Sequence, residues 1–334
     1  MSQELIRQLD GASKEVNREI ADSFSGCTEP KDLYAASNHL INAGGKRLRP
    51  FLVLKSCELT GGWREDALKV AVAIELVHNF SLVHDDIMDN DDKRRGVPTV
   101  HVKWGIPMAL LSGDMLFAKA YDAIVSSAKT RKIPPRRILK VFEVVTDATI
   151  SLCEGQALDM LFEERSDVSE REYLDMIGKK TAALIEAAAK SGALIGNATY
   201  KQVEALGRFG RYAGVGFQIM DDVLGLTADE KVLGKPVGSD IREGKRTMIL
   251  INALSKADAS HRGQILSVLG NKVASSDKVE DVIELIQSLG SVDYAAKMAE
   301  KFIEKAKSQL TIFPPSANKE VLLNLCDYII SRKY

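Results

Sequence analysis

The segment from residue 67 to residue 95 limits the possible fold more than any other part of the chain. It begins with an apolar stretch, residues 67–83, that has the periodicity of a buried helix, and it ends in a cluster of carboxylates and arginines. Each residue of a helix turns by about 100°, so Asp89 lies about 40° round from Asp85 and one turn further on. Both carboxylates therefore point the same way. Because a charge that emerges from an apolar helix needs a partner, this pattern predicts the wall of a cavity.

Two carboxylates side by side repel each other, and a divalent cation with oxygen ligands relieves that repulsion. Mg²⁺ is the first candidate, because it takes only one or two carboxylates and completes its shell with water and substrate phosphates. His78 lies on almost the same face as Asp85, roughly 10 Å back along the helix. A solvated acidic surface is the alternative, and it is the usual meaning of an isolated Asp-Asp pair. A second pair, Asp221-Asp222, also ends an apolar helix and favours the metal site.

The bulk composition argues against several classes of partner. With 45 Lys and Arg against 46 Asp and Glu in 334 residues, the charge is balanced and indicates neither nucleic acid nor an anionic membrane surface as the general partner. The four cysteines, Cys27, Cys57, Cys153 and Cys326, form no CxxC spacing and favour a reduced, cytoplasmic protein. The N-terminus lacks the apolar core of a signal peptide, and without a run of about 18 apolar residues we expect no integral membrane segment.

Helical periodicity recurs along most of the chain. We predict helices over residues 3–24, 30–42, 51–59, 67–83, 107–128, 135–164, 172–195, 200–227 and 320–330, with a further helical pattern from residue 248 onward. We find no convincing alternating strand and no glycine-rich βαβ fingerprint, and we expect residues 96–99 to form a turn. The predicted fold class is therefore all-α: a single large helical bundle around a central cavity, with residues 1–334 as one domain and polar residues converging inside one end.

Three cation-rich stretches suit an anion. Lys46, Arg47 and Arg49 follow Gly44-Gly45 at the start of a buried helix, although such a motif alone is more often a surface loop. Lys180-Thr181 brings an ammonium group and a hydroxyl to an apolar helix. The third stretch, residues 227–247, is too long for an idle connection and predicts a lid or binding loop. Its cations are Lys231, Lys235, Arg242, Lys245 and Arg246.

This combination of groups suits a particular chemistry. Acid clusters on two facing helices, separated by a cavity and surrounded by Lys and Arg, can hold several Mg²⁺ ions against a diphosphate. The metal and the cations stabilise the charge on a departing diphosphate, so that its bond to carbon breaks heterolytically. Apolar walls exclude the water that would quench a carbocation. No Ser-His-Asp or Cys-His set is evident, and five histidines are too few and too scattered for a zinc cage.

The ordered motifs resemble those of the trans isoprenyl diphosphate synthases, or polyprenyl synthetases. Asp85-Asp86-Ile87-Met88-Asp89 is similar to the first aspartate-rich motif of that family, DDxxD, and Gly45-Lys46-Arg47-Leu48-Arg49-Pro50 matches GKRxRP. Further matches in the family's order are Gln156 with Asp159, Lys180-Thr181, Phe217 to Asp222, and Gly234-Lys235 through Gly244-Lys245. The resemblance spans nearly the whole chain. It implies an all-helical, homodimeric transferase of prenyl groups that acts in isoprenoid biosynthesis.

The resemblance also implies roles for individual residues. Lys46, Arg49, His78 and Arg95 would hold the diphosphate of isopentenyl diphosphate, the acceptor. Asp85, Asp89 and Asp221 would bind several Mg²⁺ ions that bridge the allylic diphosphate, and Arg94, Lys180, Lys235 and Lys245 would neutralise its oxygens. Thr181 and Gln218 would line the reaction centre, so the expected catalytic residues are Asp85, Asp89, Lys180, Thr181, Gln218 and Lys235. The allylic diphosphate would ionise, the double bond of isopentenyl diphosphate would attack, and the released diphosphate would take the proton.

Two positions depart from the family pattern. Gly225 stands where the second aspartate-rich motif usually has a third acid, while Asp221 and Asp222 remain. We therefore expect metal binding at this motif to be weakened rather than abolished. Ile249 stands where proline often follows the Lys-x-Thr of the lid loop.

The length of the product is expected to depend on residues one turn before the first motif. Ser81, four residues before Asp85, is small and leaves room, whereas Phe80, five before it, is bulky but about 140° round. An ordinary core phenylalanine is the alternative interpretation of Phe80. An aromatic residue five positions before the first motif, together with a small residue four positions before it, resembles the pattern of the archaeal-type geranylgeranyl diphosphate synthases. The expected product is geranylgeranyl diphosphate, and farnesyl or longer diphosphates (geranylfarnesyl and beyond) are the alternatives.

Three other classes of protein are weighed against the synthase. A class I terpene cyclase shares the bundle and DDxxD, but its second motif has Ser and Glu where this chain has Gly225 and Asp229, and it has no use for a second diphosphate site. A regulatory subunit of a heteromeric synthase typically loses its acids, whereas this chain keeps five of the six. A plain helical scaffold explains the apolar periodicity but not the converging charges.

Overall fold

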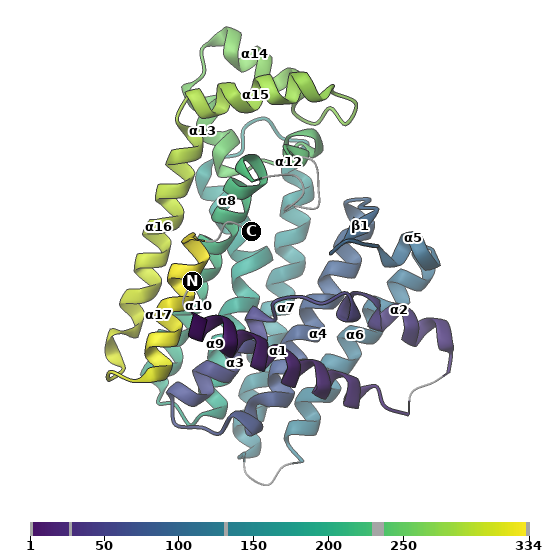
Figure 1. The fold of residues 1–334 in the computed structure, drawn as a ribbon, viewed down its shortest axis with the longest axis vertical. Coiled ribbons are helices and arrows are strands. Elements are labelled where there is room, and N and C mark those ends of the chain that lie inside the picture. The colour runs from purple at the N-terminus through teal and green to yellow at the C-terminus, as the bar shows by residue number, and fades with distance from the viewer. Residues whose placement is uncertain (1–2, 27–28, 130–132, 229–236, 332–334) are drawn as a thin grey trace. The chain divides into compact units, whose positions relative to one another are not determined.

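The computed structural model describes residues 3–26, 29–129, 133–228 and 237–331, and these residues are mostly helical. In chain order the elements are α1 (Gln3–Ser23), α2 (Lys31–Asn42), α3 (Leu48–Leu59), α4 (Arg64–Met88), β1 (Lys93–Arg94), β2 (Val97–Pro98), α5 (Val100–Trp104), α6 (Ile106–Ser127), α7 (Pro135–Glu163), α8 (Glu170–Ile177), η1 (Gly178–Ala182), α9 (Ala183–Ile195), α10 (Tyr200–Thr227), α12 (Ser239–Glu243), α13 (Met248–Lys256), α14 (Ala259–Val268), α15 (Ser276–Ser288), α16 (Ser291–Gln309), η2 (Leu310–Ile312) and α17 (Ala317–Ser331) (Figure 1). The all-α prediction is confirmed. The expectation of no strand needs one correction, because β1 and β2 form a small hairpin.

The packing divides the chain into two compact units. Unit 1 comprises residues 1–149, 184–210 and 309–325, and unit 2 comprises residues 150–183, 211–308 and 326–334. Some helices contribute to both units: α7 gives residues 135–149 to unit 1, and α10 gives it residues 200–210. The organisation of residues 1–334 as a single domain stays a prediction.

α4 is the central helix of unit 1. Residues 70–77 are all buried, and α4 packs against α3 and α6 (Figure 1). A helix that is buried all round suits the middle of a core rather than its surface. Glu75, an acid within this buried run, is an exception that needs a partner. An 18-residue window of α4 has a mean hydropathy of 1.3, enough for a membrane span by length and composition alone, but 67% of that window is buried inside the protein, as in a core helix.

The acidic end of α4 keeps the geometry inferred from the sequence. The helix runs from Arg64 to Met88, so it is longer at both ends than the predicted residues 67–83. Asp89 is the C-cap with helical backbone angles, and its N–H donates to the carbonyl oxygen of Asp85 at 2.8 Å. Asp85 and Asp89 therefore lie one helical turn apart on the same side of α4.

The hairpin after α4 turns on two residues with positive φ. Arg95 has φ 53° and Gly96 has φ 77°, and β1 pairs with β2 in antiparallel fashion around them. Two such residues give a turn whose twist suits paired strands. Glycine adopts this conformation freely, whereas an arginine needs outside support. That support comes from the carbonyl oxygens of Leu40, at 2.8 Å from Nη1 of Arg95, and of Gly44, which accepts from the same nitrogen.

The predicted helix over residues 172–195 contains an irregular turn. α8 ends at Ile177, residues 178–182 form the π-helical turn η1, and α9 continues from Ala183. Turns of this kind are rare and frequently occur at functional sites. Gly155 of α7 allows η1 to approach closely, because a Cβ on Gly155 would lie only 2.2 Å from the backbone nitrogen of Lys180.

The segment predicted as a lid loop is partly helical. α12 lies between Gly238 and Gly244, whose φ angles are 73° and 85°. In this left-handed conformation the two glycines start and stop the helix without the strain that a side chain would add. Residues 229–236 of the predicted loop, which include Lys231 and Lys235, lie outside the described residues.

Gly155→Ala tests the close approach of α7 to η1. The added methyl group would meet backbone atoms of Lys180, which cannot move aside as a side chain can. We expect the free energy of unfolding, measured by chemical denaturation, to fall by about 1–3 kcal/mol. Gly263→Ala in α14 is the control, because nothing lies within 4 Å of a Cβ there and alanine favours a helix by about 0.5–1 kcal/mol. Equal effects of the two substitutions would contradict the close packing.

Candidate active site

The acidic end of α4 combines exposed and paired carboxylates. Asp86 is fully buried, and Nε of Arg94 donates to its Oδ1 in a short ion pair. Nη2 of Arg94 also lies 3.4 Å from Oδ2 of Asp91. Asp85 and Asp89, in contrast, are only partly buried. Arg94, which the resemblance assigns to the allylic diphosphate, is therefore anchored at this end of α4 by two other carboxylates.

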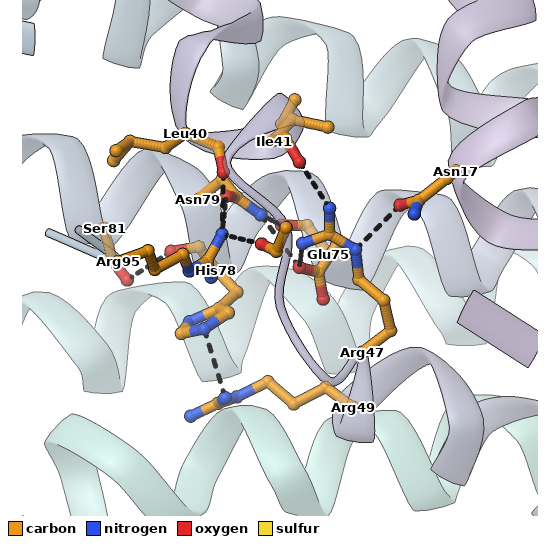
Figure 2. Close-up of polar contacts among 11 residues, drawn as sticks. Asn17, Leu40, Ile41, Arg47, Arg49, Glu75, His78, Asn79, Ser81 and Arg95 are labelled. Carbon is orange, nitrogen blue, oxygen red and sulfur yellow. Dashed lines mark hydrogen bonds and ion pairs between the residues drawn. The ribbon is translucent and has the colours of Figure 1, made fainter. Parts of the chain in front are cut away.

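Arg49 and Arg95, two of the cations predicted to hold the acceptor's diphosphate, lie near His78 in unit 1 (Figure 2). Nη1 of Arg49 lies 3.3 Å from Nε2 of His78. Arg95 is held by Leu40 and Gly44, as described for the hairpin. Lys46 is exposed, one residue after the glycine pair that precedes α3. The structure thus brings together three groups that are separated along the chain: the turn before α3, the middle of α4 and the hairpin.

The electrostatics of this cluster favour an anion. Burial, and then the positive charges of Arg49 and Arg95, hold the pKa of His78 well below its ordinary value of 6.5, so His78 is neutral at pH 7. Because a guanidinium group has only donors, Nε2 of His78 accepts from Arg49 and the proton is on Nδ1. Burial lowers the pKa of Arg95 to about 10, and the charge of Glu75 offsets part of that effect. The arginines remain charged, which suits a diphosphate.

A buried ion pair lies behind these cations, and the sequence did not identify it as part of the site. Nη1 of Arg47 donates to Oε1 of Glu75 at 2.7 Å, and the two side chains are 0% and 2% exposed. Nδ2 of Asn79 donates to the same Oε1 at 2.9 Å (Figure 2). One signal was present in the sequence: Glu75 is an acid in the middle of an apolar run.

A pocket in unit 2 holds the second group of predicted residues. Oγ1 of Thr181 donates to Oε1 of Gln218 at 2.8 Å, and Nε2 of Gln218 donates to Oδ1 of Asp222 at 2.9 Å. Nζ of Lys180 donates to Oδ2 of Asp159 at 2.6 Å. The lining consists of Asp159, Tyr173, Met176, Ile177, Lys180, Thr181, Gln218, Asp222, Asp240, Lys245, Arg246 and Thr247. The π-turn η1 therefore delivers Lys180 and Thr181 to one polar pocket.

Asp222 and Asp240 add carboxylates to this pocket. The hydroxyl of Tyr173 donates to Oδ2 of Asp222 at 2.6 Å. Burial, and then the charge of Asp240, raises the pKa of Asp222 to about 7. A cation that approaches would favour the charged form of Asp222. Oδ2 of Asp240 lies 3.3 Å from the position that a Cβ on Gly225 would take, so the place of the missing third acid adjoins a carboxylate that the sequence did not single out.

Three further predicted residues have different outcomes. Lys245 lines it, and its Nζ lies 2.7 Å from Oε2 of Glu243. Asp221, one residue before Asp222 on α10, is partly buried in unit 2. Lys235 lies outside the described residues. Because Asp85 and Asp89 belong to unit 1, the prediction that they share a cavity with Asp221 stays a prediction.

Phe80 begins a row of aromatic rings in unit 1. Its centroid lies 5.2 Å from that of Phe117 on α6. Phe117 contacts Tyr121 at 4.8 Å, and Tyr121 contacts Phe142 of α7 at 4.9 Å. All four rings are partly buried. Ser81 is buried, and its hydroxyl donates to the carbonyl oxygen three residues earlier at 2.9 Å.

Comparison with known proteins decides the family. Residues 30–286 match the polyprenyl synthetase family model. The geranylgeranyl diphosphate synthase of Methanosarcina mazei is 45% identical over 330 residues, which cover 99% of this chain and 98% of that protein. The chain belongs to the polyprenyl synthetase family. The geranylfarnesyl diphosphate synthase of Aeropyrum pernix is also similar, at 43% identity over 307 residues that cover 91% of this chain and 95% of that one.

Solved structures of polyprenyl synthetases have the same fold as this chain. The geranylgeranyl pyrophosphate synthetase of Pyrococcus horikoshii gives a TM-score of 0.92 at 45% identity and covers 99% of both chains. The geranylgeranyl pyrophosphate synthase of Corynebacterium glutamicum, complexed with isoprenyl diphosphate and magnesium, gives 0.88 at 25% identity and covers 98% of this chain and 99% of that one. The resemblance inferred from the motifs is confirmed, and this polyprenyl synthetase is a transferase of prenyl groups.

Mg²⁺ fits the donor chemistry of this polyprenyl synthetase. Among the described residues, no three His, Cys, Asp or Glu side chains form a group that could hold a metal by themselves. Asp85 and Asp89 instead offer two carboxylates one turn apart, on a partly exposed side of α4. Because Mg²⁺ takes one or two carboxylates and fills the rest of its shell with water and phosphate oxygens, these two residues match its preference.

Proposed function

We propose that this polyprenyl synthetase condenses isopentenyl diphosphate with an allylic diphosphate, with Mg²⁺ bound, and that its main product is geranylgeranyl diphosphate. One observation carries the proposal. α4 has Asp85 and Asp89 at its end, and about two turns earlier it has His78, which meets Arg49. The first group suits a diphosphate bridged by metal, and the second suits a diphosphate held by cations alone. A synthase needs both sites, whereas a terpene cyclase binds one diphosphate.

The acceptor, isopentenyl diphosphate, binds to Lys46, Arg49, His78 and Arg95. The hydrogen bonds that orient Arg95 all use its Nη1, so the other edge of the guanidinium group is directed by them toward a phosphate oxygen. Neutral His78 adds an Nδ1–H donor without adding charge, because its Nε2 accepts from Arg49. The exposed ammonium group of Lys46 adds a further positive charge to the site.

Asp85, Asp89 and Asp221 would hold the Mg²⁺ that serves the allylic diphosphate. The two carboxylates one turn apart at the end of α4 support this role for Asp85 and Asp89. When bound, the metal neutralises charge on the departing diphosphate. The cations Arg94, Lys180, Lys235 and Lys245 add to this stabilisation. Arg94 does so from a position set by Asp86, and Lys180 from a position set by Asp159. Thr181 and Gln218, joined by a hydrogen bond, line the reaction centre with oxygen atoms that can face positive charge on carbon.

The reaction needs no side-chain base. The carbon–oxygen bond of the allylic diphosphate breaks, and both electrons leave with the diphosphate. The double bond of isopentenyl diphosphate attacks the allylic carbon, forms the new carbon–carbon bond and leaves positive charge on the acceptor's tertiary carbon. Loss of a proton from the neighbouring carbon to the released diphosphate restores a double bond. The protein's part is to hold the two substrates in line and to exclude water.

Asp85→Asn and Asp221→Asn test the metal-binding role. An amide is a much weaker ligand for Mg²⁺ than a carboxylate, so we expect kcat to fall by at least ~100-fold in each variant at saturating substrate. Incorporation of labelled isopentenyl diphosphate measures the rate, and circular dichroism checks the fold. Asp10→Asn, at an exposed position of α1, is the control and should keep full activity. Wild-type turnover in either site variant would contradict the proposed metal-binding role of that residue.

The row of rings that starts at Phe80 supports geranylgeranyl diphosphate as the product. Phe80 lies five residues before Asp85 on α4, and we propose that its ring lies in the path of the growing chain. Phe117 and Tyr121 lie behind it at 5.2 and 4.8 Å steps, so the ring is backed by others rather than by flexible side chains. The similarity to both geranylgeranyl and geranylfarnesyl synthases agrees with a pocket whose floor is set by a small number of side chains.

Phe80→Ala is expected to lengthen the product. Loss of the first ring would leave room for at least one further five-carbon unit before the chain meets Phe117. Chromatography of labelled products made from farnesyl diphosphate and isopentenyl diphosphate measures the length distribution. Phe24→Ala removes a buried ring that contacts Tyr34 instead, and it should leave the distribution unchanged. An unchanged distribution in Phe80→Ala would show that Phe80 is not the floor.

We also propose that the enzyme is a cytoplasmic homodimer. Five apolar side chains on α5 and α6 are at least 44% exposed: Val102, Ile106, Leu110, Leu111 and Val125. Such a surface favours association with a second copy. Sedimentation velocity should give twice the mass of one chain, and a monomer at micromolar concentration would contradict the dimer.

The proposed cytoplasmic location is supported by two buried cysteines. Cys57 and Cys326 have no disulfide, which agrees with a reducing compartment.

A further inference from the structure

One carboxylate ties two separate parts of the acceptor site together. Glu75 lies in the fully buried stretch of α4. Its Oε1 accepts from Nη1 of Arg47 at 2.7 Å and from Nδ2 of Asn79 at 2.9 Å (Figure 2). The first bond fastens the turn before α3 to α4, and the second fastens the side chain of Asn79 on α4 itself. Charge is concentrated at this point, because the Arg47–Glu75 pair is almost entirely buried.

Arg47 sets the conformation of the turn that carries the acceptor's cations. It is the N-cap of α3, with φ 49° and ψ 39°, in the left-handed region. A residue other than glycine is strained in this region, so the surroundings must hold it. Three hydrogen bonds do so, to Oδ1 of Asn17 at 2.9 Å, to the carbonyl oxygen of Ile41 at 2.7 Å and to Glu75. The neighbours of Arg47, exposed Lys46 and partly buried Arg49, take their directions from this fixed turn.

Glu75 also acts on Arg95, through the side chain of Asn79. Oδ1 of Asn79 lies 3.5 Å from Nη1 of Arg95, so the amide that Glu75 holds also faces this guanidinium group. Gly45 separates the two arginines: a Cβ there would lie 3.1 Å from Nη1 of Arg47 and 3.2 Å from Cζ of Arg95. Two like charges thus lie close to the same glycine. Glu75 is the carboxylate that raises the pKa of Arg95 against burial and the charge of Arg47.

We propose that Glu75 is a positioning residue for the diphosphate of the acceptor. It holds Arg47 and so fixes the turn that presents Lys46 and Arg49, and through Asn79 it orients Arg95. Glu75 itself touches no substrate atom. The inference rests on the proposed acceptor site. It adds the group that holds three cations of that site, Lys46, Arg49 and Arg95, in their relative positions.

A purely stabilising role is the competing explanation, and the energetics of buried ion pairs separate the two. Removal of one partner leaves an unmatched buried charge and is strongly destabilising. Replacement of both partners by apolar side chains of similar volume is often neutral for stability. If Glu75 serves only stability, the double replacement restores both the stability and the binding of the acceptor. If it positions Arg47, the double replacement restores stability but not the binding of the acceptor.

The experiment compares Glu75→Gln with the double variant Arg47→Met/Glu75→Leu. In both we expect the KM for isopentenyl diphosphate to rise at least about tenfold, since a small misplacement of binding groups has large effects. We expect the KM for farnesyl diphosphate, the half-saturating Mg²⁺ concentration and kcat at saturating acceptor to stay within about threefold of wild type. The melting temperature should fall in Glu75→Gln and recover in the double variant. An unchanged acceptor KM in Glu75→Gln, or a wild-type KM in the double variant, would overturn the proposal.

Two further variants make the result specific. Glu58→Gln breaks a partly buried ion pair of Glu58 with Lys55 and Arg64 in the same unit and should leave both KM values unchanged. Arg49→Met removes a proposed direct ligand and should raise the KM for isopentenyl diphosphate. If Arg49→Met has no effect, the proposed acceptor site is wrong. If Arg49→Met raises the KM and Glu75→Gln does not, the acceptor site stands and only the positioning role of Glu75 fails.

Discussion

A charge inside a protein must be matched, and α4 is the place where this constraint is most severe. The helix is buried on all sides through residues 70–77, yet it carries Glu75 within that stretch and three aspartates at its end. These acids are accommodated in different ways. Glu75 pairs with Arg47, Asp86 pairs with Arg94, and Asp85 and Asp89 lie on a partly exposed side of α4, where two carboxylates suit Mg²⁺. The parts of unit 1 that surround α4, including the turn before α3 and the hairpin, are arranged around these acids.

The sequence alone predicted those features that depend on the spacing of residues along one helix. The helical turn between Asp85 and Asp89 depends only on helix geometry, and the structure keeps it because Asp89 still caps α4 with helical angles. The all-α fold followed from apolar periodicity, and the family followed from motifs in order. Boundaries were less accurate: α4 extends beyond both predicted ends, because Glu65 and Asp66 favour the first turn of a helix even though they are polar.

Features that depend on tertiary contacts could not be predicted from the sequence. The π-turn at Lys180 packs closely against Gly155 of α7, and these two segments are separate in the chain. The hairpin of β1 and β2 is too short for an alternating pattern, and an arginine at positive φ has no sequence signal. The carboxylate of Asp240 beside Gly225 is visible only when α12 is in place. Glu75 was visible in the sequence as an acid within an apolar run, but its partner Arg47 lies in the turn before another helix, α3.

The hairpin turn gives two adjacent cations different surroundings. Arg94, in β1, bonds to Asp86 between Asp85 and Asp89, the aspartates proposed to bind metal, and Arg95, in the turn, bonds to the carbonyl oxygens of Leu40 and Gly44 at the proposed acceptor site. The division depends on where the chain reverses. One inserted or deleted residue in β1 would shift the register and exchange the surroundings of the two guanidinium groups. Under the roles proposed for Arg94 and Arg95, the length of this short hairpin therefore matters for selectivity as much as the identity of its arginines.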